Sequence, residues 1–166
     1  MKQACDLLLK GLRNFREVLA RRAVEFKYTP MIGRTHGIHG EPITFGVKLV
    51  NWMSEIDRDI ARLEQARQSV AVGKLSGAVG TLASQPEKGL EIQKRMMEIL
   101  GLEQPTISWH VARDSQAEFA STLALCAGTL GRIAHEILSL QRTEILELEE
   151  PFFIGKVGSS TMLNDE

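Results

Sequence analysis

The sequence predicts an all-α domain made of long helices that pack side by side as a bundle. The first observation is the spacing of apolar residues, which recur at intervals of four and three over long stretches. In the stretch 43–71 they are Leu49, Met53, Ile56, Ile60, Leu63, Ala66 and Val70. The second observation is that the prolines and most glycines gather in short zones between such stretches. No stretch shows a sustained period of two, so the helical period decides the fold class.

The zones rich in glycine and proline divide the chain into elements, with loops in the zones and helices between them. The expected loops cover residues 28–42, 72–86, 101–112 and 151–166, and the expected helices cover about residues 3–27, 43–71, 87–100 and 113–149. The second and fourth helices would be about 43 and 55 Å long at 1.5 Å per residue. Helices of that length pack nearly parallel or antiparallel, which predicts a single bundle domain over residues 1–166.

Composition excludes several classes of protein. The 166 residues include 20 Lys and Arg against 21 Asp and Glu, for a net charge of −1. This balance argues against nucleic acid or an anionic membrane surface as the partner, because both select basic surfaces. No apolar run approaches the roughly 20 residues of a membrane span. The two cysteines, Cys5 and Cys126, lie far apart and favour a reduced, cytoplasmic protein over a disulfide-stabilised secreted one.

The loop at 28–42 is rich in side chains that carry chemistry. Arg34, Thr35, His36 and His39 stand among three glycines just before a long predicted helix. Glycines let a backbone approach a ligand, free N–H groups at a helix N-terminus favour an anion, and histidine exchanges a proton near neutral pH. The alternative is a glycine-rich turn with surface histidines. We expect no metal here, because no Cys or clear acidic third ligand lies nearby.

Each of the other loops allows two interpretations. In the second loop, Lys74 is followed by Leu75 instead of the Ser or Thr that a phosphate-binding loop requires. Lys74 and the neighbouring backbone N–H groups either bind an anion or form a tight turn between helices. In the third loop, Trp109 and His110 either line a pocket or pack against the fold. In the fourth, a Gly-Ser-Ser string is by itself typical of a flexible linker.

Four strings of residues occur in one order along the chain. They are Gly33 to Gly37 with the following Glu41-Pro42, Gly73 to Thr81, Leu140 to Glu144, and Gly158 to Met162. In this combination the chain resembles the adenylosuccinate lyases, a family of the fumarase/aspartase superfamily. The resemblance covers essentially the whole chain and corresponds to the central helical domain of that family.

The resemblance implies an elimination that cleaves a C–N bond and releases fumarate. The implied substrates are adenylosuccinate and the succinylated carboxamide ribotide of purine biosynthesis, and the reaction uses no cofactor and no metal. One side chain removes a proton beside a carboxylate, and another protonates the departing nitrogen. The resemblance also implies a homotetramer with a shared helical core, in which several subunits build each active site.

The resemblance assigns roles residue by residue. His36 matches the general acid of the family, and Ser159 matches its catalytic base. Further residues match positions that bind substrate, and these are Arg34, Thr35, Lys74 and Ser160. A serine acts as a base only where positive charge stabilises its alkoxide strongly.

The chain departs from the family pattern after Met162. The family signature continues with Pro-x-Lys-x-Asn-Pro, whereas this chain reads Leu163-Asn164-Asp165-Glu166. The missing lysine is the obvious charge for activating Ser159. We therefore expect the chain to be an incomplete and inactive fragment of such an enzyme.

A second departure concerns Trp109 and His110. Adenylosuccinate lyases more often have a glutamine-containing string there, and a Trp-His string is more similar to that of the related carboxymuconate cycloisomerases. Two alternatives therefore stand beside the adenylosuccinate lyase. One is a cycloisomerase-like enzyme of the same superfamily, and the other is a non-catalytic helical assembly module whose apolar stripes drive association.

Overall fold

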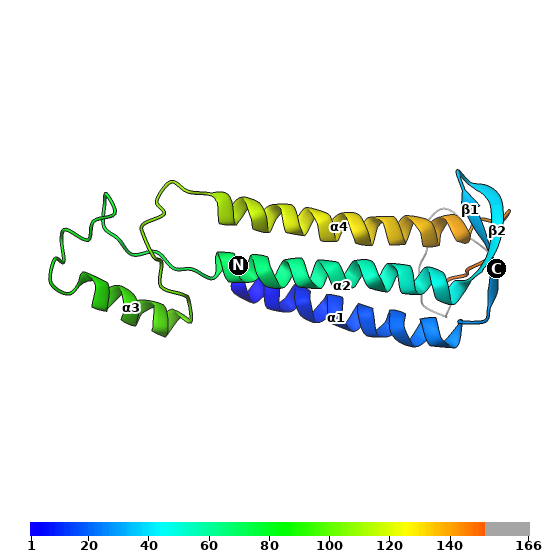
Figure 1. The fold of residues 1–166 in the computed structure, drawn as a ribbon, viewed down its shortest axis with the longest axis horizontal. Helices are drawn as coiled ribbons and strands as arrows, with labels where there is room; N and C mark the ends of the chain where they lie inside the picture. Colours follow the sequence, from blue (N-terminus) through cyan, green and yellow to red (C-terminus); the bar gives the residue numbers. More distant parts are fainter. Residues whose placement is uncertain (152–166) are drawn as a thin grey trace, which may run out of the picture. The chain divides into compact units, whose positions relative to one another are not determined.

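The computed structural model describes residues 1–151 and confirms the all-α fold class. Four helices of 24, 26, 12 and 27 residues account for most of that part of the chain. The elements are α1 (Lys2–Glu25), β1 (Pro30–Thr35), β2 (Ile38–Thr44), α2 (Phe45–Val70), α3 (Gly89–Leu100) and α4 (Asp114–Leu140), as Figure 1 shows. The chain forms two compact units, one comprising residues 1–130 and one beginning at Gly131.

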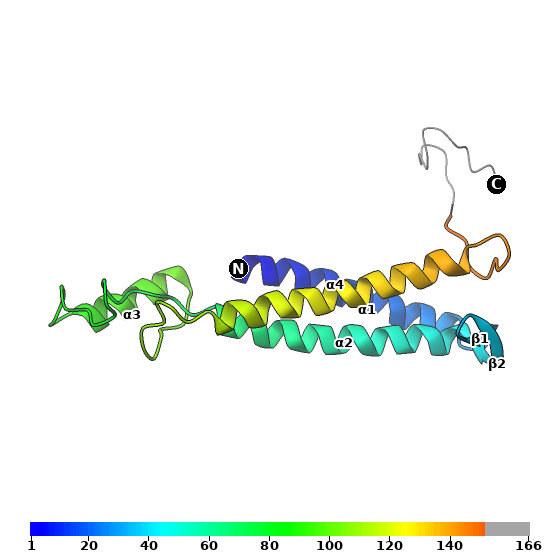
Figure 2. The ribbon, with the colours of Figure 1, turned by 90° about the horizontal axis from the view of Figure 1, so that it is seen from above.

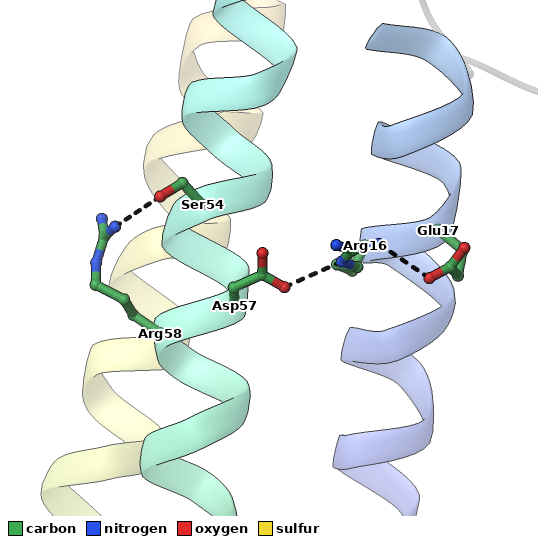
Figure 3. Close-up of polar contacts among 5 residues, drawn as sticks. All are labelled: Arg16, Glu17, Ser54, Asp57 and Arg58. Carbon is green, nitrogen blue, oxygen red and sulfur yellow. Dashed lines mark hydrogen bonds and ion pairs between the residues drawn. The ribbon is translucent and has the colours of Figure 1, made fainter. Parts of the chain in front are cut away.

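Helices α1 and α2 lie side by side and run antiparallel, as both Figure 1 and Figure 2 show. Each buries one stripe of apolar residues, and Ile56 and Leu63 of α2 are completely inaccessible to solvent. Ion pairs connect the two helices along their length. They are Arg67–Asp6 at 2.6 Å, Arg13–Glu64 at 2.5 Å and Arg16–Asp57 at 3.0 Å. Figure 3 shows Arg16 of α1 between Asp57 of α2 and Glu17 of its own helix.

Residues 114–130 of α4 bury small and polar side chains, and one of these contacts α2. Thr122, Cys126 and Thr129 are buried. The Thr129 hydroxyl donates a hydrogen bond to Oε1 of Glu55, at 3.2 Å. By length and composition α4 could also cross a membrane, a weak criterion that core helices of soluble proteins meet as well.

The segment from Ala71 to Arg113 connects α2 to α4 and contains α3. Helix α3 ends at Gly101, whose left-handed backbone, with φ of 63°, closes the helix. The inner face of α3 buries Gln93 and Met97. Gly73 lies so close to this face that an added Cβ would collide with Sδ of Met97. The amine of Lys2 in α1 donates a hydrogen bond to the Gly101 carbonyl oxygen, at 2.5 Å.

The prediction of a loop over 28–42 was wrong, because residues 30–44 form the antiparallel hairpin of β1 and β2. Proline disfavours strands because it cannot donate to a ladder, yet Pro42 pairs with Ile32 in this hairpin. In a sheet of two strands each strand is an edge strand, so proline is tolerated where its nitrogen faces away from the partner.

The prediction that the last helix extends to residue 149 was also wrong, because α4 ends at Leu140. The following chain turns back, and the N–H groups of Glu147 and Leu148 donate to the Leu140 carbonyl oxygen at 3.0 and 3.3 Å. Leu146 adopts a left-handed backbone with φ of 49°. A longer helix would have placed several carboxylates at the negative end of its dipole, which is unfavourable. These carboxylates are Glu144, Glu147, Glu149 and Glu150.

Candidate active site

His36 lies at the tip of the β1–β2 hairpin. Thr35 pairs with Ile38, so His36 and Gly37 form a two-residue turn between the strands. Both have positive φ, 54° for His36 and 76° for Gly37, as a type I′ turn requires. The imidazole of His36 is exposed to solvent at this tip. Because the backbone of the turn is fixed by strand pairing, the hairpin presents the imidazole from a defined position.

The strand register shifts by one residue between Ile32 and Arg34. Gly33 lies at this bulge, and an added Cβ there would meet the carbonyl oxygen of Glu41 at 2.8 Å. A bulge bends a hairpin and redirects the side chains beyond it. Arg34 and Thr35 follow the bulge directly, so Gly33 permits the backbone geometry that places them beside His36.

The base of the hairpin is held by the adjacent helix ends. The N–H of Phe45 donates to Thr29, and the N–H of Gly46 donates to Phe26, at 2.9 and 3.0 Å. The rings of Phe26 and Phe45 lie 5.3 Å apart. Thr44 caps α2 by accepting a hydrogen bond from the N–H three residues later, at 3.3 Å. The hairpin is therefore anchored to both helices that it connects.

Lys74 belongs to a second cluster, in which loop 73–77 contacts residues 108–110. The amine of Lys74 lies 5.5 Å from the centre of the Trp109 ring. The indole N–H of Trp109 donates to the Gly73 carbonyl oxygen at 2.9 Å. Nε2 of His110 lies 2.7 Å from the Gly77 carbonyl oxygen. Because a carbonyl oxygen only accepts, Nε2 carries the proton in this bond.

The predicted site residues that the structure describes thus lie in two separate groups. Arg34, Thr35 and His36 lie together on the hairpin, which precedes α2, whereas Lys74 follows α2. The 26 residues of α2 extend about 39 Å. Within one chain the His36 group and the Lys74 group are therefore too far apart to contact one small molecule. The predicted residues Ser159 and Ser160 lie outside the described residues.

The contacts of Trp109 and His110 with loop 73–77 were not predicted. From the sequence, both residues could either line a pocket or pack against the fold. In the structure their side chains contact the carbonyl oxygens of Gly73 and Gly77. Every residue has a backbone carbonyl oxygen, so residue types do not reveal such contacts. Ser76 and Ser108 add a hydroxyl–hydroxyl hydrogen bond of 3.0 Å between the same segments. Within residues 1–151, no group of three or more His, Cys, Asp or Glu side chains is arranged to hold a metal ion.

Comparison with known proteins places this arrangement in a family. The sequence profile described as lyase matches residues 1–163. An adenylosuccinate lyase of Thermotoga maritima is 47% identical over 161 residues, which are 96% of this chain and 37% of the relative. An N-acetyl-S-(2-succino)cysteine lyase of Enterococcus italicus is 44% identical over 162 residues, which are 98% of this chain and 36% of the relative.

A solved structure gives the same result for the fold. The 3-carboxy-cis,cis-muconate lactonizing enzyme of Pseudomonas putida superposes with a TM-score of 0.87 at 35% sequence identity, over 90% of this chain and 34% of that chain. The chain thus spans about a third of the length of the relatives it matches. The match over nearly all residues confirms the resemblance drawn from the sequence: the chain belongs to the lyase family of the fumarase/aspartase superfamily.

Proposed function

We propose that this chain supplies the helical core and part of the active site of a lyase that eliminates fumarate from adenylosuccinate or its succinylated ribotide analogue. The observation that carries the proposal is the hairpin, which presents Arg34, Thr35 and His36 together at one end of α2. The relative from Thermotoga maritima, named an adenylosuccinate lyase, supports this substrate.

In the proposed reaction His36 is the general acid. A nitrogen that leaves a carbon atom needs a proton, and an exposed imidazole can supply one near neutral pH. Arg34 and Thr35 bind oxygen atoms of the substrate beside it. The proton next to the carboxylate is removed by Ser159, with Ser160 as a substrate ligand. Preorganised donors stabilise the carbanion as its charge spreads onto the carboxylate.

The distance between the two residue groups supports an active site built from several copies of the chain. An antiparallel assembly would bring the His36 hairpin of one copy toward the Lys74 loop of another. Exposed apolar side chains on the helices are consistent with a homotetramer. Val47 of α2 and Leu125 of α4 are 61% and 53% exposed in the single chain. The buried free thiols of Cys5 and Cys126 suit a cytoplasmic enzyme.

A second candidate is elimination of fumarate from a succinylated thiol. The relative from Enterococcus italicus is named for a 2-succino group on the sulfur of cysteine. Such a substrate would need the same acid and base, with sulfur as the leaving atom in place of nitrogen. The solved structure of a muconate lactonizing enzyme supports a third candidate, a cycloisomerase, which is also assayed.

A chimera tests the proposal without depending on the rest of the polypeptide. Residues 1–151 replace the matching part of the Thermotoga maritima relative. Fumarate release is measured with adenylosuccinate and with a succinylated cysteine, and lactone formation is measured with carboxymuconate. We expect release from adenylosuccinate. In the chimera, His36→Asn should lower turnover by about 10²- to 10⁴-fold, because a general acid contributes about that much. Asparagine tolerates the positive φ of this turn, so the hairpin should persist.

His39→Asn is the matched control, because His39 is an exposed histidine of the same hairpin. It should leave turnover near the level of the unsubstituted chimera. A folded chimera that acts on succinylated cysteine alone would favour the second candidate. A folded, assembled chimera that acts on none of the substrates would contradict a catalytic role and favour the assembly module.

A further inference from the structure

We propose that Trp109 is a positioning residue that holds the ammonium of Lys74 where a carboxylate of the substrate binds. This inference rests on the proposed function, since it assigns Lys74 a carboxylate ligand. Within residues 1–151, the contact made by the Lys74 amine is with the Trp109 ring, 5.5 Å from its centre. Lys74 itself is exposed to solvent.

The Trp109 indole is fixed independently of Lys74. Its N–H donates to the Gly73 carbonyl oxygen at 2.9 Å, one residue before Lys74. The neighbouring contacts of Ser108 and His110 tie the same strip to loop 73–77. The edge of one indole therefore fixes the backbone that carries Lys74, while its face receives the Lys74 ammonium.

A contact with a ring face differs from an ion pair because it leaves N–H groups of the lysine available to bind an anion. A carboxylate partner would neutralise Lys74 and accept its N–H groups. The ring attracts the ammonium through its quadrupole and leaves N–H donors for an anion. A long, exposed lysine otherwise loses much rotamer freedom when it binds a ligand. Holding the side chain against Trp109 before binding reduces that loss, which is the advantage that we assign to this pair.

The test measures the reactivity of the Lys74 amine in the intact chain. Trace labelling with an amine-acylating reagent, followed by mass spectrometry, reports how readily each lysine amine reacts. Trp109→Leu should increase labelling of Lys74 by about two- to fivefold, because an exposed cation–π contact that holds the amine against the ring is worth about that factor. Trp109→Phe keeps a ring and should restore most of the protection. Lys88, an exposed lysine in the same connecting segment, should label equally in all variants.

A second arm adds fumarate at millimolar concentration. Fumarate should protect Lys74 but not Lys88 in the wild-type chain, and protection in Trp109→Leu should need a higher concentration. Equal labelling of Lys74 in wild type and Trp109→Leu would overturn the positioning role. Unequal labelling without fumarate protection would overturn the carboxylate ligand of Lys74. That result leaves the proposed function to be decided by His36→Asn, so the two failures are distinguishable.

Discussion

Gly46 lies beneath the hairpin, where the start of α2 closely approaches the end of α1 and the turn that follows it. An added Cβ would meet the Cα of Lys27 at 2.7 Å and the carbonyl oxygen of Ala23 at 2.8 Å. Both are backbone atoms, which cannot rotate away as a side chain can. Gly46→Ala should therefore lower the free energy of unfolding by about 1–3 kcal/mol, measured as a decrease in Tm of several degrees.

Gly11→Ala is the matched control in the same helix pair. Gly11 lies inside α1, and an added Cβ would meet no atom within 4 Å. Alanine favours a helix interior over glycine by about 0.5–1 kcal/mol, so this variant should melt at a slightly higher temperature. If both variants melted alike, the close approach at Gly46 would not be a constraint.

The candidate site residues of the hairpin could be predicted from the sequence, but their backbone conformation could not. His36 and Lys74 could be singled out because both stand in strings of residues that resemble those of the adenylosuccinate lyases. The left-handed turn at His36 could not be predicted, because the strong sequence signals for such a turn are Asn-Gly and Asp-Gly, and this chain has His-Gly there. The cluster around Trp109 was equally hidden. It joins residues that lie 36 and 33 positions apart in the sequence through carbonyl oxygens, and every residue type offers a carbonyl oxygen.

At the scale of the elements, the ion pairs between α1 and α2 give a dependence on pH. The hydrogen bond from Arg67 holds the pKa of Asp6 below its usual value of 3.8. A depressed pKa in the folded state means that the stabilisation is present above the unfolded pKa and is lost as pH falls through the folded one. The wild type should therefore melt above Asp6→Asn near neutral pH, and the difference should shrink as pH falls below 3.8.

Arg67→Met removes the partner and provides the control. It should reduce the same pH-dependent difference, since the Asp6 carboxylate then lacks its donor. High salt should also narrow the gap at neutral pH, because the pair is exposed. A difference between wild type and Asp6→Asn that stays constant from neutral to acidic pH would contradict this account.

Helix boundaries were predictable where packing and propensity agree. For α2 the expected range 43–71 differs from Phe45–Val70 by at most two residues, because the apolar stripe runs the full length and Thr44 caps the start. For α4 the apolar spacing reaches Leu140, and beyond it the glutamates oppose the helix dipole. The hairpin could not be predicted because glycine and proline usually interrupt regular structure, although both fit a bulged, two-stranded ribbon.

For the whole molecule, the exposed apolar side chains of α4 predict self-association. Leu125 and Leu130 are 53% and 41% exposed in the single chain, and burying a leucine contributes about 1.5–3 kcal/mol. Light scattering should give a mass several times the 18.5 kDa of one chain. Leu125→Asp should lower that mass, because it places an unpaired charge in an apolar interface.

Ser84→Asp adds the same charge at an exposed position between α2 and α3, and it should leave the mass unchanged. A monomeric wild type would contradict the assembly. An unchanged mass for Leu125→Asp in an assembled wild type would place the interface on another face of the chain.

The anchoring of the hairpin to the start of α2 has a consequence for how the length of this chain can vary. Each residue inserted into α2 would move one end by about 1.5 Å and rotate it by about 100° relative to the other. A single insertion would therefore misdirect His36 with respect to Lys74 and shift Asp57 and Glu64 away from Arg16 and Arg13. Evolution can substitute residues in α2 but has little freedom to insert or delete them. Length changes should instead accumulate between Thr81 and Lys88, outside the Lys74 cluster, where the connection does not fix the phase of the helix pair.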